Sequence, residues 1–159
     1  MLNASGQNLR GGSGAQNNAG LGIGSTPAEL SIAAPNGAGV DYMIDGYSYH
    51  LADDATVAMT AMDAQAVSTS CLYLVMLDSS GTLSTVKGTE RLTADITSGK
   101  YKLEFPQVDA TTKCAIGGFR VDLNSSTTFT GATTDLDAAG VTDTYYNFGF
   151  GIPDKPITS

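Results

Sequence analysis

Short runs of alternating apolar and polar residues, separated by turn-forming residues, constrain the fold of this chain more than any other feature. Residues 40–51 (VDYMIDGYSYHL) alternate on both sides of Asp45-Gly46, which predicts a tight β-hairpin. Residues 69–77 and 114–123 are mostly apolar, as expected of strands buried on both faces. Further strands are expected at residues 82–87, 100–105, 127–130 and 141–150. This pattern predicts an all-β chain with a compact antiparallel β-sandwich or jelly-roll-like body, an open barrel being the variant.

Two segments refine this prediction. Residues 55–67 contain enough Ala and Met for a short helix, but they also alternate like a strand, so both assignments stay open. Gly117-Gly118 lies inside a predicted core strand, where glycine indicates a bulge or a close approach of another segment. No repeat of 20–50 residues is visible, which disfavours a propeller or a solenoid.

The N-terminal segment differs from the rest of the chain. Residues 1–24 are rich in Gly, Asn, Ser and Ala, and Arg10 is their only charged side chain. The sequence therefore predicts an extended flexible arm over residues 1–26 and a β-sandwich body over residues 27–159. Ordering such an arm costs roughly 1 kcal/mol or more per residue. We expect a neighbouring chain to supply that order by strand addition. The expected contact residues of the arm are Leu2, Leu9, Arg10, Leu21 and Ile23.

The chain is acidic, with a formal net charge of −8 and a pI of about 4.3. Its eight Lys and Arg residues are dispersed, and only residues 87–91 and 100–102 come close to forming a cluster. A nucleic-acid partner is therefore not expected, because phosphate binding needs grouped cations. The first ten residues lack the features of a secretory signal, and no apolar run approaches the ~20 residues of a membrane helix. We expect cytoplasmic synthesis without export and no membrane partner.

The residues that could carry chemistry are few. His50 is the single histidine, and its neighbours Ser48, Asp53 and Asp54 lack the turn that presents a catalytic serine. Cys71 and Cys114 lie in apolar runs, which favours buried free thiols over a disulfide or a zinc site.

Two further motifs fail on spacing. Residues 135–140 (DLDAAG) resemble the start of a calcium loop, but Ala139 and Tyr146 stand where oxygen ligands are needed. The glycines at 20, 22 and 24 do not have the spacing of a dinucleotide site. We therefore expect no catalytic, metal or cofactor-binding residues and no enzyme activity. A hydrolase with two dispersed carboxylates stays open as an alternative.

Six short segments lie in a fixed order between residues 42 and 142. They are 42–46 (YMIDG), 71–75 (CLYLV), 78–82 (DSSGT), 86–89 (VKGT), 115–121 (AIGGFRV) and 129–142 (FTGATTDLDAAGVT). In order and spacing they resemble small structural proteins encoded among the head genes of tailed bacteriophages. The resemblance spans residues 40–146 and leaves the N-terminal arm outside it.

The resemblance implies a virion protein that decorates or cements the outer surface of a capsid and is made in the bacterial host cytoplasm. It further implies the major capsid protein as partner and self-association as a homotrimer. The long Gly-rich arm departs from the family pattern and leaves an alternative open: a head-fibre or tail-associated module that binds a receptor or a carbohydrate. No site residues of the family can be carried over.

Overall fold

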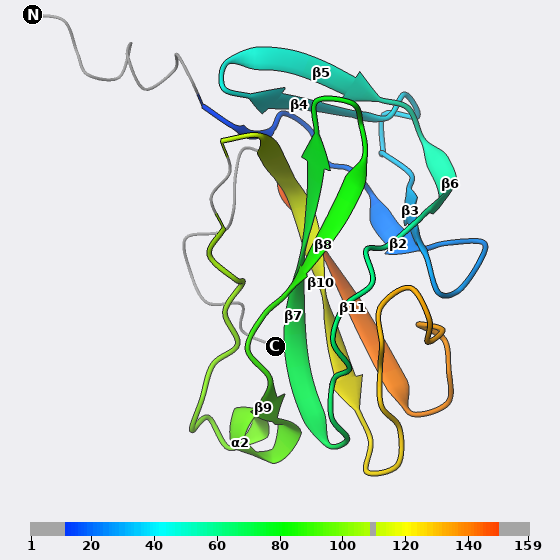
Figure 1. Ribbon diagram of the computed structural model, residues 1–159, viewed down its shortest axis with the longest axis vertical. Coiled ribbons are helices and arrows are strands. Elements are labelled where there is room, and N and C mark those ends of the chain that lie inside the picture. The colour runs from blue at the N-terminus through cyan, green and yellow to red at the C-terminus, as the bar shows by residue number, and fades with distance from the viewer. Residues whose placement is uncertain (1–11, 109–110, 150–159) are drawn as a thin grey trace, which may run out of the picture.

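A five-stranded antiparallel sheet forms the centre of the computed structural model, which describes residues 12–108 and 111–149 (Figure 1). Its strands run in the order β11-β10-β7-β8, and the short β9 also pairs with β7. The bounds of these strands are Thr69–Asp78 for β7, Leu83–Lys87 for β8, Arg91–Leu92 for β9, Lys113–Leu123 for β10 and Val141–Asn147 for β11. The expected all-β sandwich-like fold is confirmed, and the short helix α2 (Thr93–Thr97) follows β9 directly.

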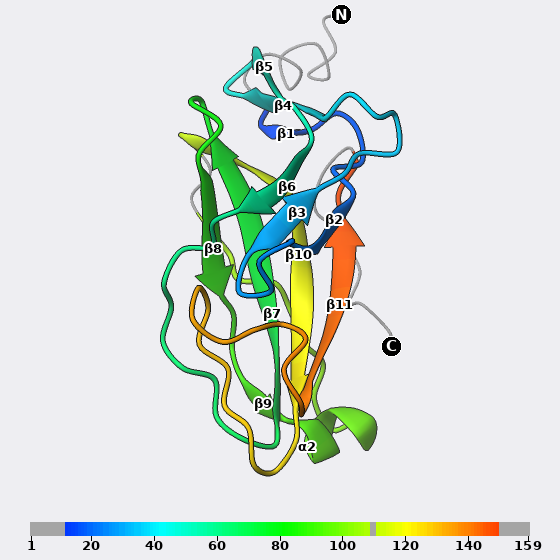
Figure 2. The ribbon, with the colours of Figure 1, turned by 90° about the vertical axis from the view of Figure 1, so that its right-hand side faces the viewer.

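Two three-stranded sheets make the second layer of the sandwich (Figure 2). One has the order β2-β3-β6 and covers one face of the central sheet, while the other has the order β1-β4-β5 and lies at one end. Their bounds are Gly14–Ala15 for β1, Leu21–Ile23 for β2, Leu30–Ile32 for β3, Val40–Ile44 for β4, Tyr47–Leu51 for β5 and Asp54–Val57 for β6.

Strand β7 is buried on both faces because apolar residues cover each side of it. Tyr73 and its neighbours on one face belong to the larger core cluster, where the Tyr73 ring stacks on Phe119 with centroids 4.8 Å apart. Leu74 and Met76 on the other face belong to a second cluster with Phe148. This double burial matches the continuous apolar run in the sequence.

Residues 98–108 cover this second cluster without forming a strand, so the predicted strand at 100–105 is wrong. Leu103 is buried, and the Phe105 ring meets Phe148 edge-on at 5.2 Å and Tyr146 at 6.1 Å. The alternation identified the residues that point inward, but their segment lies across a sheet face, where no strand edge is available to pair with. Pro106 also lacks a backbone N–H donor.

Other strand predictions are confirmed or shortened. The 40–51 hairpin is present as β4 and β5, with Asp45 at φ 48° and Gly46 at φ 82° in its turn. The ambiguous 55–67 segment begins as β6 and continues without regular structure. The predicted strand at 127–130 is reduced to one bridge, between Gln65 and Phe129. Strand β11 ends at Asn147, and position 150 of its predicted range lies outside the described residues.

The predicted boundary between arm and body is wrong, because the chain itself orders residues 14–23. Strand β1 pairs with β4, and β2 pairs with β3. Ala19 is fully buried, and the Leu21 N–H donates to Asn147 Oδ1 at 2.8 Å. Internal ladders thus supply the hydrogen bonds that we expected from another chain, and close packing of the buried Ala19 adds to the order of this segment. Residues 1–11 of the predicted arm lie outside the described residues.

The glycine pair in β10 lies where the segments that cover the two faces of the central sheet both contact it. The register of β10 against β7 shifts between Ala115 and Gly117, which confirms the predicted bulge. A Cβ on Gly117 would collide with the Leu21 side chain, and a Cβ on Gly118 would collide with the Phe105 ring. Both layers therefore need glycine at these two positions.

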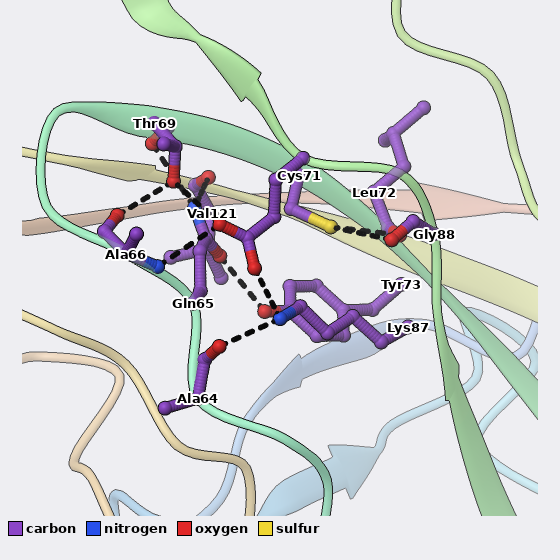
Figure 3. Close-up of polar contacts among 11 residues, drawn as sticks. Ala64, Gln65, Ala66, Thr69, Cys71, Leu72, Tyr73, Lys87, Gly88 and Val121 are labelled. Atoms are coloured by element: carbon purple, nitrogen blue, oxygen red, sulfur yellow. Dashed lines mark hydrogen bonds and ion pairs between the residues drawn. The ribbon is translucent and has the colours of Figure 1, made fainter.

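Buried Gln65 ties the irregular 58–68 segment to the central sheet (Figure 3). Its side-chain N–H groups donate to the carbonyls of Thr69 and Val121 at 3.0 and 3.1 Å, and its carbonyl accepts from the Tyr73 hydroxyl at 2.8 Å. All the donors and the acceptor of this amide are engaged, as a buried polar group requires.

Replacing Gly118 by Ala is expected to lower the free energy of unfolding by about 1–3 kcal/mol, because the added methyl meets Phe105 on one side and the Tyr73 carbonyl on the other. Gly14→Ala is the matched control, since a Cβ at Gly14 meets nothing within 4 Å. Urea denaturation of both variants measures the difference. Equal stability of G118A and wild type would show that packing of the 98–108 segment on the central sheet does not depend on this contact.

Candidate functional site

The β4–β5 hairpin projects at one end of the sandwich, and the described chain enters the body beside its tip (Figure 1). The Gly46 N–H donates to the Gly12 carbonyl at 3.2 Å, and the Asp45 N–H donates to Ser13 Oγ at 3.1 Å. Tyr47, at the same tip, is 70% exposed and is the most exposed large apolar side chain among the described residues. The tip therefore combines an exposed aromatic ring with the entry point of the N-terminal segment.

The outer edge of β5 has no backbone partner within the described residues. On β4, the Asp41 carbonyl accepts a hydrogen bond from the Gln16 N–H on the β1 side. The backbone groups of its neighbours on β4, such as Tyr42, therefore point to the other side and bond to β5. Alternation then directs the N–H and C=O groups of Ser48 and His50 away from β4. We call this edge, together with Tyr47, the hairpin surface.

Buried aromatic contacts hold the hairpin surface in place. The ring of Tyr42 on β4 stacks on Tyr49 of β5 with centroids 5.6 Å apart. The Tyr42 hydroxyl donates to the Asp78 carbonyl at the end of β7, at 2.8 Å. Burial, and after it the charge of Asp78, raises the pKa of Tyr42 above its ordinary value, so the phenol keeps this donor proton. The hairpin is thereby anchored to the central sheet.

The side chains that resembled a catalytic triad in the sequence have separate contacts. His50 Nδ1 lies 2.8 Å from Asp41 Oδ1, across the β4–β5 pair, and both side chains are about half exposed. Asp53 Oδ1 accepts a hydrogen bond from the Ala34 N–H at 2.8 Å and so connects two loop residues. Ser48 lies opposite Met43 in the ladder. These groups form an exposed cross-strand pair and a loop contact.

The structure also locates the predicted contact residues of the arm. Leu21 is buried in the chain's own core, so the prediction that it contacts another chain is wrong. Ile23 is 37% exposed at the end of β2. Leu2, Leu9 and Arg10 lie outside the described residues. The sequence predicted the hairpin. It did not predict that the outer edge of β5 has no partner among the described residues, because that depends on segments far away in the chain.

Cys71 and Cys114 are both buried and free, as the sequence predicts. Burial raises the pKa of each thiol from 9.0 to about 11. Cys71 lies near Gly88, and its Sγ is 3.4 Å from the Gly88 carbonyl. The acidic turn at residues 135–140 is anchored by buried Leu136, whose N–H donates to the Pro27 carbonyl at 2.9 Å.

The described ranges contain no cluster of three His, Cys, Asp or Glu side chains that could hold a metal ion. Within the same ranges, no helix has both the length and the apolar character needed to cross a membrane. Comparison of the chain with protein-family models, curated proteins and solved structures gave no match.

Both thiols are expected to resist alkylation by iodoacetamide at pH 8 in the native protein and to react fully in urea, because the raised pKa leaves little thiolate. Because both thiols bind their protons more tightly in the folded state, they stabilise the fold fully below pH 9. We expect the free energy of unfolding to decrease as the pH rises from 9 toward 11 and this contribution is lost. Mass spectrometry and urea denaturation across this range measure both effects. Rapid native labelling would contradict the burial of the thiols.

Proposed function

We propose that this chain is a non-enzymatic structural protein of a tailed-bacteriophage virion that decorates and cements the capsid by binding major capsid subunits. The proposal starts from the six segments between residues 42 and 142 that resemble head structural proteins of such phages. It is supported by the all-β sandwich fold of the chain. The observation that carries it is the hairpin surface, a strand edge without a backbone partner among the described residues, with an exposed aromatic tip next to Gly12.

The hairpin surface is suited to contact with another protein. The outward N–H and C=O groups of Ser48 and His50 can extend a neighbouring sheet by strand addition. Tyr47 adds a large apolar side chain with a polar hydroxyl, a type that is enriched at the centres of protein interfaces. Backbone bonds supply part of the affinity, and the aromatic ring supplies specificity.

Gly12, the first described residue, is bonded to the hairpin turn and so lies beside this surface. In the proposal, Leu2, Leu9 and Arg10 contact a capsid subunit next to the one that binds the hairpin. Two contacts on one chain, multiplied in a homotrimer, increase the avidity even when each contact is weak. Such a decoration protein would act on the outer surface of the virion.

The non-enzymatic part of the proposal is supported by the roles of the reactive side chains. His50 pairs with Asp41, Cys71 and Cys114 are buried with raised pKa values, and Gln65 is bonded inside the core. Each of these groups serves the fold.

Tyr47→Ala is expected to lower affinity for expanded capsids of the encoding phage by about tenfold or more, because it removes the aromatic anchor. Ser48→Pro should act in the same direction, since Pro removes the outward N–H at that edge position. Co-sedimentation of each variant with the capsids measures binding, and thermal unfolding checks the fold. Tyr101→Ala, which removes another exposed aromatic far from the hairpin, is the control. Wild-type protein that does not sediment with the capsids would disprove the proposal.

Deleting residues 1–11 is expected to leave the melting temperature unchanged and to reduce occupancy on capsids, because the ladders of β1 and β2 stay intact. Deleting residues 1–24 should instead lower the melting temperature, since it removes both strands and buried Leu21. Calorimetry and capsid titration separate the two effects. Full occupancy after the shorter deletion would show that the first eleven residues do not contribute to binding.

A further inference from the structure

A pocket of about 430 Å³ lies between the link that connects β8 to β9 and the segment that covers the second core cluster. Lys87, Gly88, Thr89 and Arg91 form one wall, and the other is formed by Lys102 and residues 104–107. Its volume falls within the roughly 300–1,000 Å³ of sites that bind small molecules. The pocket lies in a different part of the fold from the hairpin surface, so a ligand bound there is independent of the proposed capsid function.

The first wall is fixed by bonds to the central sheet (Figure 3). The Gly88 N–H donates to the Leu72 carbonyl at 2.8 Å, and Lys87 Nζ donates to the Ala64 carbonyl at 2.7 Å. Lys87 also forms an ion pair with Glu90. Burial opposes ionisation of Glu90, but the bonds from Lys87 and the Ala66 N–H outweigh it and hold the pKa of that carboxyl below its ordinary value. The charge of Lys87 is therefore balanced within the wall.

The second wall is fixed by aromatic packing. Leu103 is buried, and Phe105 is held between Phe148 and Tyr146. The two walls meet closely at Gly88, where a Cβ would lie 2.6 Å from the Leu72 carbonyl and 3.3 Å from the Glu104 carbonyl. The pocket is thus formed by two supported segments before any ligand arrives.

The charges that remain in the pocket are two cations and one carboxylate. Arg91 and Lys102 line it and have no ion-pair partner among the described residues, and Glu104 lines it as well. The Arg91 guanidinium lies 4.8 Å from the centre of the Tyr101 ring, a contact that restricts its orientation. In a chain of net charge −8, the pocket keeps a local excess of one positive charge.

We propose that this pocket binds a sugar unit that carries a carboxylate, such as a uronic acid. Arg91 and Lys102 supply charge-assisted hydrogen bonds to the carboxylate. Glu104 accepts hydrogen bonds from the sugar hydroxyls. Phe105 and Pro106 offer apolar surface to the face of the sugar ring.

The charge balance distinguishes this ligand from other anions. Glu104 repels a phosphate with close to two negative charges more strongly than it repels a single carboxylate, and inorganic phosphate has no ring to pack on Phe105 and Pro106. A neutral sugar can accept hydrogen bonds from Arg91 and Lys102 through its hydroxyls, but it lacks the carboxylate whose negative charge strengthens those bonds. The pocket therefore selects for one negative charge together with hydroxyl groups.

Titration of the isotope-labelled full chain with glucuronate, followed by NMR at constant ionic strength, tests the proposal. Saturable shifts of the amide signals of Gly88, Thr89 and Gln107 are expected with glucuronate but not with glucose. Inorganic phosphate is the second comparison and should bind more weakly than glucuronate. No saturable shift with glucuronate, or equal affinity for phosphate or glucose, would overturn the proposal.

Lys102→Gln is expected to weaken glucuronate binding about fivefold or more, because it removes one charge-assisted bond from an exposed side chain that the fold does not need. Lys100→Gln is the matched control: Lys100 is also exposed, but it pairs with Asp95 and does not line the pocket. It should change affinity by less than about twofold. Glu104→Gln should strengthen phosphate binding relative to glucuronate. Equal affinity of K102Q and wild type would contradict the proposed role of Lys102 and overturn the site.

Discussion

The structure depends on covering both faces of β7 at once. A strand that is apolar on each side needs two layers, and in this chain the layers approach the sheet at the glycine pair of β10, where Leu21 packs on one side and Phe105 on the other. Removing the side chains at two adjacent strand positions creates room for both contacts in one place. The segments that make these layers lie far apart in the sequence, and the contacts at the glycine pair connect the N-terminal strands, the central sheet and the 98–108 segment.

Local patterns predicted the elements whose structure is decided locally. The Asp45-Gly46 hairpin, the buried strands and the glycine pair follow from turn chemistry and from period-two alternation. The arm boundary was wrong for a physical reason: composition reports what a segment can stabilise alone, whereas residues 14–23 are stabilised by ladders with strands that come later in the chain. The 100–105 segment failed differently, because alternation reports which side chains point inward and not whether a strand edge is available.

The candidate sites depend even more on long-range arrangement. The two near-clusters of basic residues, at 87–91 and 100–102, are separated in the sequence by α2, and the fold places Lys87, Arg91 and Lys102 from them around one pocket. The sequence showed the charges but not the shared cavity. The sequence also did not show that the outer edge of β5 lacks a partner in the described part of the chain, because the pairing of an edge depends on where all the other strands lie. The sequence thus identifies the charged and aromatic side chains of these sites. Which of them share a surface can be seen only from the arrangement of the strands in the fold.

Gln65 has a consequence for how the chain finds its native alignment. Its amide is hydrogen-bonded to a β7 carbonyl, a β10 carbonyl and the Tyr73 hydroxyl, so all three bonds form together only when β7 and β10 are in their native register. If β7 slipped by one residue along β10, this amide would face the wrong groups and remain buried without partners, at a cost of about 1–3 kcal/mol for each unmet bond. The apolar runs of β7 and β10 do not by themselves fix one offset, and the hydrogen bonds of Gln65 therefore add a free-energy cost to each non-native alignment.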